Sequence, residues 1–413
     1  MPAAQQELAA LALPSLWRTP FLKLWLAQVV SVFGDFLALF GIISLITFRW
    51  HGTPVQVTTV MLAFMLPMAI ISPAAGVFVD RWSVKRLMIS SDVIRALLVL
   101  ALPFVSNVFQ ICLIFAALSA VSSFFAPAQS VALRQLVATQ QLMAANAMLS
   151  QAFYAVRILS PAVAAALVSW LSEKACFYAD SVTFALSACL LATLALAPSA
   201  GAKKEQSLRA LTADFLAGNK FIFTHAGLAF VFLAMAAAML VMSAFGPLIS
   251  IYVRDTLARG PAFYGVVSAM IGVGLIAGSQ LVARLSRSLP PQTMVLSGLL
   301  GLGLGAALLG VVNFVWMTPS STFIMGFAIA FVLVPAQTMT QQETPREMVG
   351  RVSSSFMSLI SLSQAMGLLL SGFLANLLGM RPLFVACAGV LALLAAAGYL
   401  SVRSRNREAA AIV

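Results

Sequence analysis

Long apolar segments alternate with short polar segments along almost the whole chain. Each apolar segment reaches or exceeds the roughly 20 residues that a helix needs to cross a bilayer. Twelve such segments are predicted, over residues 21–48, 55–79, 87–106, 108–133, 142–171, 175–198, 227–252, 262–285, 291–314, 317–341, 348–378 and 382–402. The pattern therefore predicts an all-α membrane protein with twelve transmembrane helices.

Composition agrees with a lipid environment. Hydrophobic residues make up 62% of the chain and charged residues only 9%, whereas soluble domains contain about 25% charged residues. The net charge is +12, but the basic residues lie singly or in small groups between apolar segments, so no nucleic-acid partner is expected. The four cysteines have no CxxC spacing, and neither a metal site nor another cofactor is expected.

The distribution of lysine and arginine predicts the orientation. Most of them fall in the N-terminal tail, the C-terminal tail and alternate loops, which places both termini in the cytoplasm of a multi-pass membrane protein. The longest loop, 199–226, separates an N-terminal bundle (1–198) from a C-terminal bundle (227–403) and a tail (404–413). Pro127-Ala128-Gln129 recurs as Pro335-Ala336-Gln337 in corresponding spans. This repeat indicates two pseudo-symmetric six-helix bundles, which is a transporter architecture.

The loop between the second and third spans carries Gly76-Val-Phe-Val-Asp80-Arg81-Trp-Ser-Val-Lys85-Arg86. Gly76 allows helices to approach closely, and Asp80 suits a helix N-terminus. Thr344-Pro345-Arg346-Glu347 is predicted to be such a start, with an N-cap, a proline and a capping glutamate. We expect Asp80 to latch the two halves in one state. The alternative is a basic loop that only sets orientation. The expected inner gate comprises Gly76, Asp80, Arg81, Lys85, Arg86, Asp92, Arg95 and Arg134.

Charged residues inside the spans are candidates for coupling. Asp35 lies about 14 residues into its span, roughly 21 Å at 1.5 Å per residue, and Arg157 is similarly central. A lone charge at this depth is costly, so we expect the two to face each other, either as structural glue or as a switch that binds a proton or substrate. Asp180 is a second candidate for coupling, or else an interfacial charge. Asp92 and Arg95 form part of the inner gate or a local ion pair.

The fifth span contains Ser160-Pro161 followed by small residues, which predicts a kink and close packing. A central cavity lined by polar, aromatic and methionine side chains suits a large amphipathic cargo. The residues expected to line it are Gln28, Ser31, Phe124, Phe125, Gln129, Tyr154, Met239, Met242, Phe245, Phe331, Gln337, Met357 and Gln364.

Several of these features together resemble one family. Gly34-Asp35, the 76–86 loop, Pro127-Ala128-Gln129, Arg157 with Pro161, and Phe177-Tyr-Ala-Asp180 are similar to the major facilitator superfamily, in the branch of macrolide efflux proteins and enterobactin exporters. The bacterial lysophospholipid transporter is also similar. The resemblance implies the major facilitator fold, alternating access, a bacterial inner-membrane location and, for most members, proton-driven export.

These features leave three hypotheses for the function. The first is a monomeric, proton-coupled exporter of drugs or other small amphipathic molecules, with the proton gradient as energy source. A lysophospholipid or siderophore transporter is the alternative within transport. A membrane receptor that has lost transport is a different class. An enzyme is not expected, because the sequence shows no nucleophile and base constellation and no phosphate-binding loop.

Overall fold

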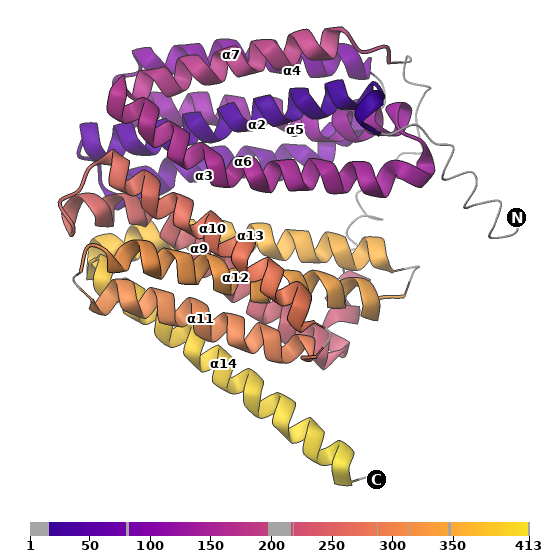
Figure 1. Ribbon diagram of the computed structural model, residues 1–413, viewed down its shortest axis with the longest axis vertical. Helices are drawn as coiled ribbons and strands as arrows, with labels where there is room; N and C mark the ends of the chain where they lie inside the picture. The colour runs from indigo at the N-terminus through magenta and orange to yellow at the C-terminus, as the bar shows by residue number, and fades with distance from the viewer. Residues whose placement is uncertain are drawn as a thin grey trace, which may run out of the picture. The chain divides into compact units, whose positions relative to one another are not determined.

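The computed structural model describes residues 16–79, 82–196, 216–217, 219–286, 288–312, 314–345 and 348–411. Helices dominate these ranges, and no strand occurs within them. Twelve of the helices are long and apolar enough to cross a membrane (Figure 1). The predicted all-α architecture with twelve spans is therefore confirmed. A helix satisfies its own backbone hydrogen bonds, which lipid cannot do.

The helices follow the predicted segments closely. In the first half they are η1 (Leu16–Arg18), α2 (Phe21–Ser44), the π-helical η2 (Leu45–Arg49), α3 (Pro54–Val79), α4 (Val84–Ala101), η3 (Leu102–Phe104), α5 (Val108–Leu136), η4 (Thr139–Gln141), α6 (Leu142–Trp170) and α7 (Glu173–Ala192). In the second half they are α9 (Ala226–Asp255), α10 (Pro261–Leu285), α11 (Pro291–Val311), α12 (Met317–Glu343), α13 (Val349–Leu378) and α14 (Met380–Ala411).

Local sequence signals account for several helix ends. The side chain of Asn107 accepts a hydrogen bond from the Gln110 backbone N–H at 2.9 Å and caps α5. Pro261 and Pro291 occupy the first positions of α10 and α11, where a missing N–H has no cost. The predicted helix start at Thr344 is wrong. Thr344 instead caps the C-terminus of α12, and α13 begins only at Val349.

Pro127 and Pro335 lie at equivalent places inside α5 and α12. Pro161 also lies inside its helix, and Ser160 Oγ donates to the Val156 carbonyl at 2.8 Å in the turn before it. Each helix continues past its proline. Prolines are tolerated within spans because serine side chains and neighbouring helices satisfy the freed backbone groups.

The chain divides into two compact units. The first comprises Met1–Ile42 and Ala63–Glu205, and the second comprises Ile43–Leu62 and Gln206–Val413. The segment Ile43–Leu62, which connects α2 to α3 and includes the adjoining helix ends, therefore belongs to the second unit. Most of the predicted boundary loop, 199–226, lies outside the described residues, and the two-bundle division at that loop stays a prediction.

The core of the first unit is an apolar cluster near the N-terminal end of α2. Phe21 and Leu24 of α2 pack with Met88 of α4, Leu133 of α5 and Leu191 of α7, each at most 4% exposed. Burial of such side chains contributes about 1.5–3 kcal/mol each in water. In lipid, van der Waals packing between the helices stabilises the fold more than the transfer of apolar side chains out of water does.

In the second unit, glycines bring α10 and α12 into backbone contact. A Cβ added to Gly274 would lie 2.1 Å from the Phe323 carbonyl oxygen, and one added to Gly326 would lie 1.9 Å from the Ile271 carbonyl oxygen. Only glycine allows this approach. Small residues at helix interfaces are the usual means by which spans associate in lipid.

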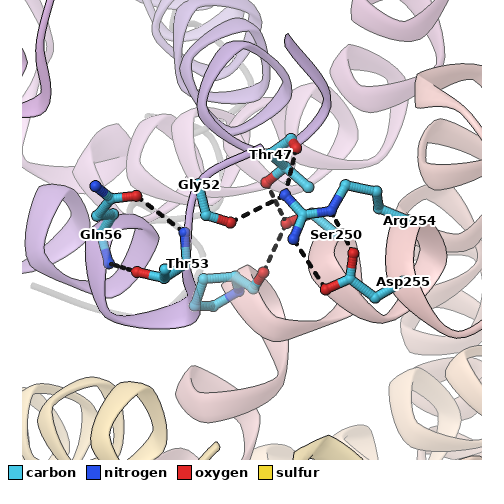
Figure 2. A network of polar contacts seen from close by, with 8 residues as sticks. Thr47, Gly52, Thr53, Gln56, Ser250, Arg254 and Asp255 are labelled. Carbon is cyan, nitrogen blue, oxygen red and sulfur yellow. Dashed lines mark hydrogen bonds and ion pairs between the residues drawn. The ribbon is translucent and has the colours of Figure 1, made fainter. Parts of the chain in front are cut away.

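A polar network joins η2 and the loop after it to the end of α9, all within the second unit (Figure 2). Arg254 donates to the backbone carbonyls of Thr47 at 2.6 Å and Gly52 at 2.9 Å, and it pairs with Asp255 through Nε and Nη2. The hydroxyls of Thr47 and Ser250 share a hydrogen bond of 2.9 Å. The network fixes the π-helical end of α2 against α9.

Candidate functional site

The candidate site begins where α2 packs against α7. A Cβ added to Gly34 would lie 2.0 Å from Thr183 Oγ1, 2.3 Å from Asp180 Oδ1 and 3.1 Å from Asp180 Cα. A Cβ added to Gly41, two turns further along, would lie 2.9 Å from Cys176 Cβ. These two glycines allow α2 to lie directly against α7. Asp35, next to Gly34, is therefore close to Asp180.

A buried ion pair on α4 lies beside this contact. Asp92 and Arg95 pair across one helical turn, and their residues are 0% and 4% exposed. Ser187 Oγ on α7 donates to Asp92 Oδ2 at 2.6 Å. The Arg95 guanidinium lies 4.6 Å from the ring centre of Phe125 and 4.4 Å from that of Phe184. Cation–π contacts of this kind hold a desolvated arginine in place.

These elements form one electrostatic unit, which we call the acid cluster: Asp35 of α2, Asp92 and Arg95 of α4, and Asp180 of α7. Asp35 interacts electrostatically with Arg95 and Asp92, and Asp180 interacts with Asp35 and Arg95. Thr183 Oγ1 also donates to Asp180 Oδ1 at 3.3 Å. The cluster contains three carboxyl groups and one guanidinium inside spanning helices.

The expected pairing of Asp35 with Arg157 is not formed. Arg95, not Arg157, is the cation that acts on Asp35. Arg157 lies on the exposed part of α6, where the titratable group that acts on it is Tyr154. Of the two alternatives for Asp92 and Arg95, the local ion pair is confirmed. That pair belongs to the acid cluster.

The other residues of the expected inner gate lie on α3, α4 and α5 or fall outside the described residues. Lys85 and Arg86 lie in the first turn of α4, half-buried and exposed respectively, and Arg134 is exposed near the end of α5. Gly76 lies on α3. Asp80 and Arg81 fall outside the described residues, so the proposed latch stays a prediction.

A pocket of about 260 Å³ lies between α2, α5 and α6 in the first unit. It contains three of the predicted cavity residues, Gln28, Gln129 and Tyr154. Its full lining is Gln28, Val29, Val32, Gln129, Ser130, Leu133, Asn146, Leu149, Ser150, Ala152, Phe153, Tyr154 and Val156. The lining combines neutral hydrogen-bonding groups with aromatic and aliphatic side chains, which is typical of sites for small molecules.

Two contacts hold α2 against α6 beside this pocket. Trp25 Nε1 donates to the Met148 carbonyl at 3.1 Å, and the rings of Phe36 and Phe153 meet edge to face at 5.8 Å. Gln28 Oε1 is buried and has no hydrogen-bond partner among the described residues. A buried acceptor without a partner costs free energy, so it is suited to receive a donor from a ligand.

The remaining predicted cavity residues of the first unit lie elsewhere. Ser31 is 2% exposed, and Phe125 packs beneath Arg95 with 6% exposure. Phe124 stacks on Trp82 at 6.3 Å. None of these three lines the described pocket.

In the second unit, the predicted cavity residues divide into core and surface. Phe245 is fully buried and stacks on Phe384 at 4.6 Å, and Phe331 is 8% exposed within an apolar cluster. The structure therefore places these two rings in the core. The others are half-buried or exposed: Met239, Met242, Gln337, Met357 and Gln364, of which Gln364 Nε2 donates to Met239 Sδ at 3.6 Å.

Several site residues were not predicted from the sequence. Thr183, Phe184 and Ser187 follow Asp180 at spacings of three, four and seven residues, which places them on one face of α7. Asn146 and Ser150 are likewise four residues apart on one face of α6, and both line the pocket. Polar residues recurring at helical spacing within an apolar segment would have identified both sets.

Comparison with known proteins identifies the family. The Major Facilitator Superfamily model matches residues 24–359 and 231–412. An uncharacterised transporter of the superfamily, YfiS of Bacillus subtilis (strain 168), is 27% identical over 378 residues, covering 88% of this chain and 89% of its own length. Macrolide efflux protein A of Streptococcus pyogenes is 25% identical, covering 89% and 92% respectively.

A solved structure shows the same fold. It is that of a bacterial homologue of the human lysosomal transporter Spinster, and it superposes with a TM-score of 0.72 at 13% identity, covering 92% of this chain and 96% of its own. The resemblance to transporters that include macrolide efflux proteins is confirmed, as is the non-enzymatic class. With twelve spans and a family match over most of its length, the chain is a multi-pass membrane transporter of the major facilitator superfamily.

Proposed function

We propose that this transporter exports amphipathic small molecules by alternating access and couples export to proton uptake at the acid cluster. It acts as a monomer in the bacterial inner membrane, with both termini in the cytoplasm and with no cofactor other than the proton gradient. Its relation to macrolide efflux protein A supports the direction of transport.

The charge balance of the acid cluster carries the proposal. Asp92 is already neutralised by Arg95 and receives the Ser187 hydroxyl, so Asp35 and Asp180 have no cation of their own within the cluster. Two neighbouring carboxylates at bilayer depth repel each other and are poorly solvated. One proton shared by Asp35 and Asp180 relieves both costs, which makes the pair the site of proton exchange.

Helix α2 connects proton exchange to cargo. Gln28 and Asp35 are seven residues apart and therefore lie on the same face of α2. Gln28 lines the pocket, and Asp35 belongs to the acid cluster. A change in the α2–α7 contact on protonation therefore displaces the pocket wall.

The energy available is sufficient. One proton moving down a potential of 100 mV provides about 2.3 kcal/mol. Since about 1.4 kcal/mol corresponds to a factor of ten in concentration ratio, one proton per cargo molecule supports a gradient well above tenfold.

The test is transport in proteoliposomes with and without an imposed pH gradient, using an amphipathic dye as cargo. Wild-type transport should accelerate with the gradient, whereas Asp35→Asn and Asp180→Asn should transport at a rate that the gradient does not change. Glu343→Gln, which removes an exposed acid at the end of α12, is the matched control and should behave as wild type. Undiminished acceleration in both aspartate variants would exclude the acid cluster from coupling.

A further inference from the structure

Arg157 is a charged side chain in the middle of a span for which the acid cluster provides no partner. Among the described residues it makes no hydrogen bond and no ion pair, and its side chain is exposed. The cation that acts on the carboxyl groups of the cluster is Arg95, not Arg157. A guanidinium at bilayer depth without an anion is costly, so its retention calls for a partner that is absent from the described chain.

The helical geometry of α6 aligns Arg157 with the pocket. Asn146, Ser150, Phe153 and Arg157 are separated by four, three and four residues, so they form one stripe along α6. The first three line the pocket. Arg157 therefore extends the pocket-lining face by one turn towards the middle of the span.

The chemistry of this stripe is that of a site for a molecule with an acidic group. A guanidinium presents a planar fork of donors that matches a carboxylate or phosphate with two parallel hydrogen bonds. The turn before Arg157 presents Phe153 and Tyr154, whose ring centres lie 5.9 Å apart. The two residues are 41% and 39% exposed. Exposed rings provide an apolar surface for the body of the same molecule.

We infer that the cargo is an anionic amphipath whose acidic group binds Arg157 and whose apolar part packs on Phe153 and Tyr154. This inference rests on the transport function proposed above and specifies its substrate class. The pocket volume of about 260 Å³ is just below the range of sites for drug-sized ligands, whose volumes are about 300–1,000 Å³. The pocket therefore receives one part of the cargo, and the acidic group continues beyond it to Arg157. Neutral donors and acceptors such as Ser150 and Gln28 supply orientation and no competing charge.

Binding to a matched pair of probes tests this. Dansylaminoundecanoic acid and its methyl ester share an aromatic group and an apolar chain, and only the acid carries a negative charge. Binding is measured by fluorescence with the purified full-length chain in nanodiscs of zwitterionic lipid, with empty nanodiscs subtracted. No gradient is applied, so the result does not depend on proton coupling.

Wild-type protein should bind the acid roughly tenfold or more tightly than the ester, as expected for a charge-assisted bidentate contact. Arg157→Gln should remove this preference and leave ester binding unchanged, which also shows that the variant is folded. Arg157→Lys should keep part of the preference. Arg284→Gln, an exposed arginine in the last turn of α10, is the control and should keep all of it.

An acid preference that persists in Arg157→Gln would overturn the inference, as would equal binding of acid and ester by wild type. If Arg157→Gln binds neither probe, the Arg157→Lys variant decides. Loss of the acid preference in Arg157→Lys, with ester binding intact, supports the inference, and full retention of the preference overturns it.

Competition then identifies the source of the anion. Stronger displacement by lysophosphatidylglycerol indicates a lipid cargo, stronger displacement by naphthoate indicates a soluble acid, and displacement by neither overturns the inference.

Discussion

Replacing Gly34 by alanine tests the contact on which the acid cluster depends. The new methyl group would lie 2.0 Å from Thr183 Oγ1, 2.3 Å from Asp180 Oδ1 and 3.1 Å from Asp180 Cα. Rotation of the two side chains relieves the first two overlaps, but it breaks the hydrogen bond between Thr183 and Asp180. The third overlap involves backbone and requires α2 and α7 to separate by a few tenths of an ångström.

Overpacking of this kind costs about 1–3 kcal/mol, and the gain in helix propensity on replacing glycine by alanine recovers at most about 1 kcal/mol. Gly34→Ala should therefore lower the thermal midpoint in detergent, measured by size-exclusion chromatography after heating, and should weaken the response of transport to a pH gradient. Gly389→Ala is the control, because a Cβ there meets no atom within 4 Å. If Gly34→Ala were as stable as Gly389→Ala and fully coupled, the close α2–α7 contact would be refuted.

Two further substitutions test other polar contacts. Ser187→Ala removes a 2.6 Å hydrogen bond to the buried Asp92 carboxylate and should destabilise the protein by about 1.5–3 kcal/mol, whereas Ser90→Ala, whose hydroxyl bonds only within its own helix, should be close to neutral in the same thermal assay. Arg254→Gln removes the donors to two carbonyls in η2 and the following loop and should lower the thermal midpoint by an amount equivalent to about 1–3 kcal/mol. An unchanged midpoint would show that the network of Figure 2 does not fix the end of α2.

The twelve spans were predictable because lipid imposes a simple requirement of length and apolarity on every helix. The contacts of the charged residues were not. Asp35 and Arg157 lie at similar depth, and depth alone suggested that they pair. Which residues meet depends also on how each helix is rotated, and the close contacts of Gly34 and Gly41 place this part of α2 against α7. The groups that interact with Asp35 therefore lie on α4 (Asp92 and Arg95) and on α7 (Asp180).

The failed prediction at Thr344 has a different cause. The residues Thr344-Pro345-Arg346-Glu347 have the composition of a helix start, but α12 continues to Glu343 and Thr344 occupies its C-cap position. Propensity at a short loop is a weak determinant when the packing of the preceding helix sets where the chain turns. Sequence patterns therefore predicted the number and order of the helices better than the chemistry at their ends.

The separation of Arg157 from the acid cluster leads to a last prediction, a double-mutant cycle on acid binding with Asp35→Asn and Arg157→Gln. Residues that pair directly show interaction energies of about 0.5–3 kcal/mol, whereas independent sites are additive within about 0.3–0.5 kcal/mol. Because the cation that acts on Asp35 is Arg95 and not Arg157, replacement of Asp35 should leave the acid preference of Arg157 unchanged, and the two effects should add. Strong non-additivity would mean that the two side chains pair after all. Additivity would mean that α6 recognises the charge of the cargo while α2, α4 and α7 bind the proton. Substitutions could then change substrate selectivity and proton coupling separately.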